Sequence, residues 1–377
     1  MPEPLALRTV IVGTGSHIPE VVVPNAHFLH HDFRDQDGEP IGRPNAEVLQ
    51  RFQEITGIRE RRYAAPRQVT TDLAADAAAK ALASAGISGD DVDAIIVAHN
   101  FGDVRAGHRI PDLVPSIAAR VKARLGIRNP RAVAFDLVFG CPGWLQGVIL
   151  ADSMIRSGDA RRVLVVGADT LSRISDPHDR DSMIYADGAG AVILEGRAGD
   201  AGEAGEAGDA GVLAALARTD AVGHADLLTM GASNHPEAFL ESIFLKMEGR
   251  KVYRYALGMV AAAMSEVLEK AGVTVPQVKK FLIHQANGKM DEAILQALFR
   301  LHDLGEPDPA LLPLTISWLG NSSVATVPTL LDLIVRGELE GHTLEEGDLV
   351  VLASVGAGMH INAAVVRWAG VGGQGRE

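Results

Sequence analysis

The single cysteine of the chain, Cys141, has the setting of a nucleophile. It directly precedes a helix that the apolar spacing predicts through Met154, and Pro142 suits the first turn of that helix. A thiol at a helix N-terminus lies at the positive end of the helix dipole, which stabilises the thiolate and lowers the thiol pKa below its ordinary value of about 8.5. Attack on a thioester needs such a nucleophile. The alternative for a lone cysteine among small residues is a buried packing role.

Two further residues with useful chemistry lie where a strand is expected to end or a helix to begin. His284 follows the apolar residues 281–283, so its side chain is expected to emerge at the end of a strand. Asn321 lies in a Gly-Asn-Ser-Ser turn before an apolar helix that extends through Val335. The alternatives are a packed or surface histidine and an asparagine that only caps the helix.

The chain repeats one pattern of elements, and the repeat relates these three residues. A helix, a glycine and a short apolar strand occur in residues 72–100 and again in 255–286. Cys141 and Asn321 then stand at equivalent strand-to-helix turns of the two copies, and His284 ends one of the repeated strands. In a pseudo-twofold fold the ends of equivalent strands meet near the axis, so we expect the three side chains to converge.

The repeat also predicts the fold class and the domain organisation. Strands that alternate with helices in both copies are typical of α/β proteins with buried sheets. We place the first half at residues 1–195 and the second at 212–370. Residues 196–211 read GRAGDAGEAGEAGDAG, and this small, acidic, low-complexity composition predicts a flexible surface loop between the halves.

Composition excludes several classes of function. The formal net charge of −13 argues against nucleic acid as the main partner, because binding phosphates requires a dominant basic surface. No uninterrupted apolar run is long enough to cross a membrane. One cysteine in 377 residues excludes an internal disulfide framework and any multi-cysteine metal site, and a reducing, cytoplasmic setting is expected.

The sequence resembles β-ketoacyl-acyl carrier protein synthase III and its relatives in the thiolase superfamily over nearly the whole chain. The segments that carry the resemblance occur in the family's order and spacing, at residues 12–15, 56–61, 135–141, 187–191, 284–287, 320–323 and 356–358. The resemblance implies a five-layered αβαβα fold built from two duplicated halves, in a protein that forms a homodimer.

The same resemblance implies a two-step reaction. Cys141 would accept an acyl group from a thioester, and a malonyl group on acyl carrier protein would then lose CO₂ and attack the acyl-cysteine. His284 and Asn321 would donate hydrogen bonds to the thioester oxygen as the enolate forms, and the backbone N–H groups of Cys141 and Ala357 would hold the oxyanion on the acyl-enzyme. Acyl-coenzyme A and carrier-bound acyl groups are the implied substrates, with no further cofactor and no metal.

Acyl carrier protein is acidic, so basic residues on the surface of this negatively charged chain could attract it. By the resemblance, Arg250, Arg254 and Lys289 fall where the family docks its carrier. Arg180 corresponds to an arginine that stacks on the adenine of coenzyme A, but Arg51 replaces the tryptophan that completes this clamp. A carrier-bound primer is therefore a further possibility.

Another departure concerns the acyl pocket. Val114 occupies a position where the family often has phenylalanine, which favours a longer or branched acyl chain and a specialised relative. Alternatives to malonyl condensation are a reaction with a β-ketoacyl partner, as in dialkylresorcinol formation, and transfer of the acyl group to an oxygen nucleophile. A non-catalytic partner subunit is a third alternative, although such subunits typically lose the nucleophile or its helpers, and this chain retains all three.

Overall fold

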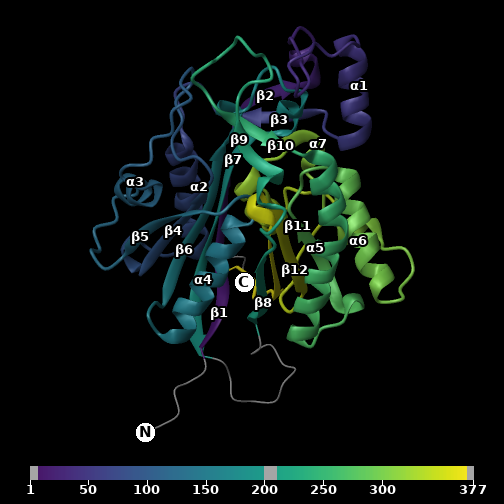
Figure 1. Cartoon of the computed structure of the whole chain (residues 1–377). Coiled ribbons are helices and arrows are strands. Elements are labelled where there is room, and N and C mark those ends of the chain that lie inside the picture. The colour runs from purple at the N-terminus through teal and green to yellow at the C-terminus, as the bar shows by residue number, and fades with distance from the viewer. Residues whose placement is uncertain (1–6, 199–209, 372–377) are drawn as a thin grey trace.

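The central strands of both halves are apolar on both faces, as expected where helices cover both sides of a sheet. β4 (Ala94–His99) and β12 (Leu349–Gly356) are buried at every residue. The computed structural model describes residues 7–198 and 210–371, and it places these two strands in separate sheets (Figure 1).

The two sheets have corresponding strand orders. The first has the order β1-β7-β6-β4-β5, with β1 (Leu7–His17), β5 (Val133–Val138), β6 (Arg162–Thr170) and β7 (Asp187–Ala198). The second has the order β11-β12-β13-β8, with β8 (Gly211–Thr219), β11 (Val278–Ile283) and β13 (His360–Arg367). In each sheet a parallel pair, β4 with β6 or β11 with β12, is followed by two antiparallel pairings.

Helices between and outside the sheets complete five layers, which confirms the predicted αβαβα thiolase-like fold. α4 (Gly143–Ser157) and α8 (Thr326–Val335) contact strands of both sheets and form the middle layer. α2 (Thr70–Ala85) and α3 (Ile117–Arg124) cover the outer face of the first sheet. α5 (Gly249–Ala271) and α6 (Gly288–Leu301) cover the outer face of the second sheet (Figure 1).

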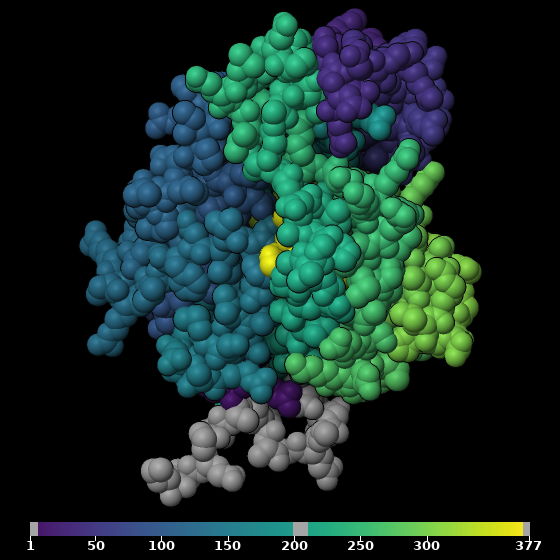
Figure 2. Space-filling view, in the orientation of Figure 1, coloured from purple at the N-terminus to yellow at the C-terminus, as the bar shows by residue number. Residues whose placement is uncertain are grey.

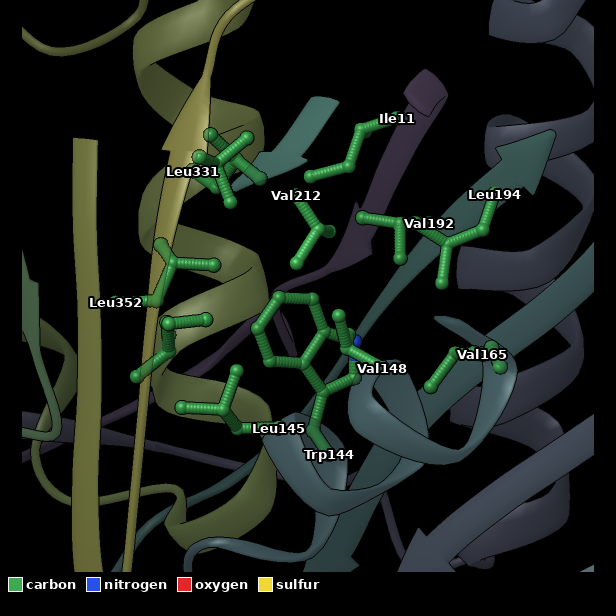
Figure 3. Packing of buried hydrophobic residues seen from close by; sticks show 14 of the residues in the cluster. Ile11, Trp144, Leu145, Val148, Val165, Val192, Leu194, Val212, Leu331 and Leu352 are labelled. Atoms are coloured by element: carbon green, nitrogen blue, oxygen red, sulfur yellow. The ribbon is translucent and has the colours of Figure 1, made fainter. Parts of the chain in front are cut away.

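The middle layer packs around Trp144, which lies three positions after the cysteine and is fully buried. Its ring is surrounded by Leu145 and Val148 of the same helix and by residues of both sheets, such as Val192 and Leu352 (Figure 3). Large aromatic side chains bury more apolar area than any other residue, so this contact anchors the start of α4 between the halves. The turn that carries the nucleophile is thereby attached to the hydrophobic core between the two sheets.

Smaller elements lie together at one end of the molecule, at the top of Figure 1. They are α1 (Asn45–Thr56), β2 (Val21–Pro24), β3 (Glu60–Tyr63), β9 (Leu228–Gly231), β10 (Phe244–Met247) and α7 (Ile316–Leu319). On the face shown in Figure 2, the blue and green parts of the chain meet along a furrow in which yellow atoms of the C-terminal region appear.

The segment between the halves is shorter than the predicted loop at both ends. Residues 196–198 pair with β1 as the last part of β7, and Gly211 begins β8, because both ends continue the backbone ladders of their sheets. The central part of the predicted loop, residues 199–209, lies outside the described residues. None of the helices within 7–198 and 210–371 has the length and hydropathy to cross a membrane.

Candidate active site

A cavity of about 1370 Å³ lies between the two halves, and Cys141, His284 and Asn321 all line it. The first side chain comes from the turn between β5 and α4, the second from the end of β11, and the third from the turn before α8. The convergence expected from the internal repeat is therefore what the structure shows.

The backbone around Cys141 is pressed against a loop of the other half. Gly140 has a left-handed φ of 75°, and a Cβ at this position would lie 2.9 Å from the amide nitrogen of Ala357. A Cβ at Gly356 would lie 2.6 Å from the amide nitrogen of Cys141. Only glycine permits such close approach, and it brings the Cys141 and Ala357 amide groups side by side.

The thiol of Cys141 is the end of a hydrogen-bonded chain of side chains. Ser323 Oγ donates to Cys141 Sγ at 3.4 Å, and Asn100 Nδ2 donates to Ser323 Oγ at 2.8 Å. Asn100 is itself held by Asp169, which accepts from the Asn100 backbone N–H at 2.8 Å and from its side-chain amide at 2.6 Å. Because the amide of Asn100 occupies an acceptor site of the serine oxygen, the hydroxyl hydrogen is directed to the sulfur.

Electrostatics around the thiol differ from the prediction. Burial raises the pKa of Cys141 to about 11, the hydrogen bond from Ser323 lowers it, and the charge of Asp169 raises it. The predicted lowering by the helix dipole is therefore wrong for the resting protein, because the loss of hydration outweighs the favourable terms. The thiol is protonated at neutral pH and must give up its proton when it attacks.

His284 is buried at the end of β11, where its backbone N–H donates to the Ala353 carbonyl at 2.8 Å. Burial lowers the pKa of its imidazole to about 4, although a hydrogen bond with the backbone of Ser323 raises it. The ring is therefore neutral at physiological pH. A neutral imidazole has one N–H to donate and one lone pair to accept a proton, so it can serve both a thiol and a thioester oxygen.

Asn321 is held by backbone and side-chain contacts at the junction with the first half. Its N–H donates to the Ile184 carbonyl at 3.0 Å, and its carbonyl accepts from Ala186 N–H at 2.8 Å. Its Oδ1 accepts from the Ser323 N–H at 2.8 Å, which leaves the amide N–H₂ as the end available to a substrate. The alternative role as cap of the apolar helix does not hold, because α8 begins only at Thr326.

The basic residues singled out in the sequence lie around the same cavity. Those that line it are Arg51, Arg180, Arg250, Arg254 and Lys289. A second cavity of about 390 Å³ adjoins it and shares Arg51 and Lys289. Two acidic residues, Glu47 and Asp181, lie among these cations.

Val114 is the one predicted site residue that the structure does not bring to the cavity. Its side chain is 86% exposed, and residues from other segments line the cavity of this chain. The residue lies in the segment before α3, which carries the further exposed apolar side chains Ile110 and Leu113. Within a single chain, Val114 therefore does not limit the acyl pocket.

Four functional candidates were missed by inspection of the sequence, namely Asn100, Asp169, Tyr185 and Ser323. A signal existed for two of them: Asn100 directly follows β4, the strand equivalent to the one that His284 follows, and Ser323 belongs to the same turn as Asn321. For Asp169 and Tyr185, nothing in the local pattern separates them from packing residues of β6 and of the segment before β7.

The hydrogen bond to the sulfur gives a direct prediction. The Ser323→Ala variant loses a donor that favours the thiolate, so the pKa of Cys141 rises and its alkylation by iodoacetamide at a fixed pH slows by roughly tenfold. The matched control is Ser322→Ala, whose hydroxyl lies 3.3 Å from Thr326 Oγ1 and contributes no hydrogen bond to the sulfur. Equal alkylation rates in the two variants would contradict the role assigned to Ser323.

Comparison with known proteins places this site in a family. The model of 3-oxoacyl-[acyl-carrier-protein (ACP)] synthase III matches residues 135–220, and the model of its C-terminal part matches residues 268–368. A β-ketoacyl-[acyl-carrier-protein] synthase III from Cereibacter sphaeroides (strain ATCC 17025) is 35% identical over 367 residues, which are 97% of this chain and 100% of the relative.

Solved structures agree with this assignment. The 3-oxoacyl-(acyl carrier protein) synthase III of Pseudomonas aeruginosa PAO1 superposes with a TM-score of 0.76 at 30% identity, covering 97% of this chain and 99% of that one. The priming β-ketosynthase of the R1128 polyketide biosynthetic pathway has a TM-score of 0.77 at 25% identity and covers 98% of both chains. The chain belongs to the 3-oxoacyl-[acyl-carrier-protein] synthase III family.

Proposed function

We propose that the protein is an acyltransferase that condenses an acyl group on Cys141 with malonyl-acyl carrier protein and releases CO₂. The observation that carries this proposal is that a thiol, a neutral imidazole and a carboxamide from both halves line one cavity. The halves, at residues 1–195 and 212–370, are the duplicated units, and the first supplies the nucleophile. The proposal places the enzyme in the cytoplasm, where its single thiol stays reduced.

In the first step the Cys141 sulfur attacks the carbonyl carbon of an acyl thioester. A carbon–sulfur bond forms to the enzyme, and the bond to the sulfur of coenzyme A or of the carrier breaks. The thiol proton passes to the leaving thiolate, and the neutral imidazole of His284 is the group in the cavity suited to accept and return it. The amides of Cys141 and Ala357 stabilise the oxyanion between these events.

In the second step the malonyl thioester loses its carboxylate as CO₂, and the electron pair of that bond moves to the thioester oxygen to form an enolate. The N–H of His284 and the amide of Asn321 donate to this oxygen, and both are uncharged donors in a buried setting. The enolate carbon then attacks the acyl-cysteine, the carbon–sulfur bond to Cys141 breaks, and the thiolate takes up a proton. The acyl group arrives as a thioester, so the cycle uses no separate cofactor.

A condensation assay tests the function. Wild-type protein given an acyl thioester and malonyl-acyl carrier protein releases CO₂ and forms the 3-oxoacyl carrier, and His284→Ala or Asn321→Ala lowers this rate by at least about 100-fold. A 2-acyl-3-oxoacyl product formed from a β-ketoacyl acceptor without CO₂ release, or an ester formed from an alcohol acceptor, would favour the alternative reactions. Undiminished condensation in both variants would contradict the proposed roles.

The basic residues at the mouth of the cavity support carrier docking. Arg250 and Arg254 are exposed one helical turn apart at the start of α5, and Lys289 is exposed in the first turn of α6. Together they present three cations to an acidic partner beside the opening. Such charges mainly steer association, so their effect should depend on salt.

Charge reversal tests this docking surface. The double variant Arg250→Glu/Arg254→Glu should raise the KM for malonyl-acyl carrier protein by about tenfold at low salt, without a comparable change for a small malonyl thioester that lacks the carrier. Arg156→Glu is the matched control, because Arg156 is exposed at the opposite end of α4 and does not line the cavity. An equal loss with both thioesters would show that the two arginines act on the site and not on the carrier.

The free edge of the first sheet supports a homodimer. β5 is the last strand of its sheet, and exposed apolar side chains lie on it and on the preceding segment, at Ile110, Leu113, Val114, Val133 and Val138. An uncovered edge with such a patch is a site for self-association. We propose that two copies meet along β5. In such a dimer Val114 would face the partner subunit and would lie near the partner's acyl pocket, whereas it does not reach the pocket of its own chain.

Sedimentation analysis tests the dimer. The wild-type protein should sediment as a dimer at micromolar concentration, and Ile110→Asp/Val114→Asp should shift it to the monomer because two charges are placed in the apolar patch. Val222→Asp, an exposed valine outside the patch, should remain dimeric. A monomeric wild-type protein would overturn the interface.

A further inference from the structure

Tyr185 carries a buried hydroxyl in the wall of the active-site cavity. The residue is only 4% exposed, it lines the cavity with Cys141, and its hydroxyl has no hydrogen-bond partner among the described residues. Within the part of the chain that the structure describes, several buried polar side-chain atoms have no hydrogen-bond partner. Among them, only the Tyr185 hydroxyl and His284 Nδ1 belong to side chains that line the cavity.

The backbone places Tyr185 directly beside Asn321. The two residues form a parallel bridge, and Asn321 hydrogen-bonds to the neighbours of Tyr185, accepting from Ala186 and donating to Ile184. Side chains of paired residues in a ladder lie on the same face, so the phenol and the carboxamide face the same space. Burial holds the pKa of Tyr185 well above its usual range, and the nearby carboxyl groups of Asp181 and Asp179 raise it further.

The ring of Tyr185 lies in an apolar wall. Its cluster includes Leu171 and Ile184, with Phe101 and Leu245 packed against it, and all four also line the cavity. An acyl chain on Cys141 needs such a wall, because acyl pockets bury most of their ligand against apolar side chains. The hydroxyl is thus a donor placed among apolar side chains suited to a hydrocarbon chain.

A hydroxyl buried without a hydrogen-bond partner destabilises the folded protein, and phenylalanine would fill the same wall without that cost. A cavity that is built to hydrogen-bond a substrate oxygen discriminates strongly against analogues that lack it. The phenol proton is retained at all physiological pH values, so the group acts as a donor.

We propose that Tyr185 donates a hydrogen bond to an oxygen on the acyl chain held by Cys141, so that the site prefers acyl groups with a β-carbonyl or β-hydroxyl oxygen over plain alkyl chains. We assign the β position because Tyr185 is paired with Asn321 and lines the same cavity as Cys141. This inference rests on the proposed acyl transfer to Cys141 and adds the class of acyl group that the site selects.

Acyl transfer alone, without malonyl carrier, tests the inference. The rates of Cys141 acylation by hexanoyl-, β-hydroxyhexanoyl- and β-oxohexanoyl-coenzyme A are measured by intact mass spectrometry for the wild type and for Tyr185→Phe. The wild type should prefer the oxygen-bearing donors, and the variant should lower kcat/KM for them about tenfold while the hexanoyl value changes less than about threefold. Tyr63→Phe, which removes a phenol oxygen outside the cavity, should leave the ratio unchanged.

The outcomes separate this inference from the proposed function. If none of the three donors acylates Cys141, the proposed acyl transfer itself is contradicted. Acylation by all three with no preference in the wild type, or an equal loss for all three in Tyr185→Phe, would overturn the role of Tyr185 and leave the transfer intact. The preference among the three donors is measured on the wild-type protein. Its absence would therefore overturn the inference even if Tyr185→Phe folds poorly.

Discussion

The site depends on one contact between the two halves of the chain, where the backbone of the nucleophile turn meets the loop after β12. Gly140 and Gly356 allow this contact, because a Cβ on either would lie within 3 Å of a backbone nitrogen of the opposite segment. The packing of Trp144 between the sheets holds the turn in place from behind. Since the nucleophile and its partners come from different halves, any shift between the sheets would separate them.

Burial of this junction determines the chemistry that the side chains can carry out. Loss of hydration raises the pKa of the Cys141 thiol to about 11 and lowers that of His284 to about 4, so both groups rest uncharged. Neutral groups can sit next to each other without repulsion, and the imidazole is then ready to accept a proton or to donate one. The chain from Asp169 through Asn100 and Ser323 supplies a side-chain hydrogen bond that favours the thiolate.

Much of this arrangement could be predicted from the sequence, because internal repetition carries spatial information. The repeat predicted the α/β layers, and it related Cys141, His284 and Asn321 through the ends of equivalent strands. It could not predict the thiol pKa, since the helix dipole is visible in a sequence but the depth of burial is not. The network behind the sulfur was missed because Asn100, which follows β4, and Asp169, near the end of β6, are distant in sequence from Ser323. Val114 illustrates the opposite error, a residue placed by resemblance that the single chain leaves exposed.

The central claim is that the cavity between the halves transfers an acyl group to Cys141. Intact mass spectrometry of the folded protein after incubation with an acyl-coenzyme A or acyl carrier protein tests it directly, because the chain has a single cysteine. The account predicts one added acyl group, located on the peptide that contains Cys141 and absent in the Cys141→Ala variant. An adduct that persists in that variant, or no adduct with any acyl donor, would contradict it.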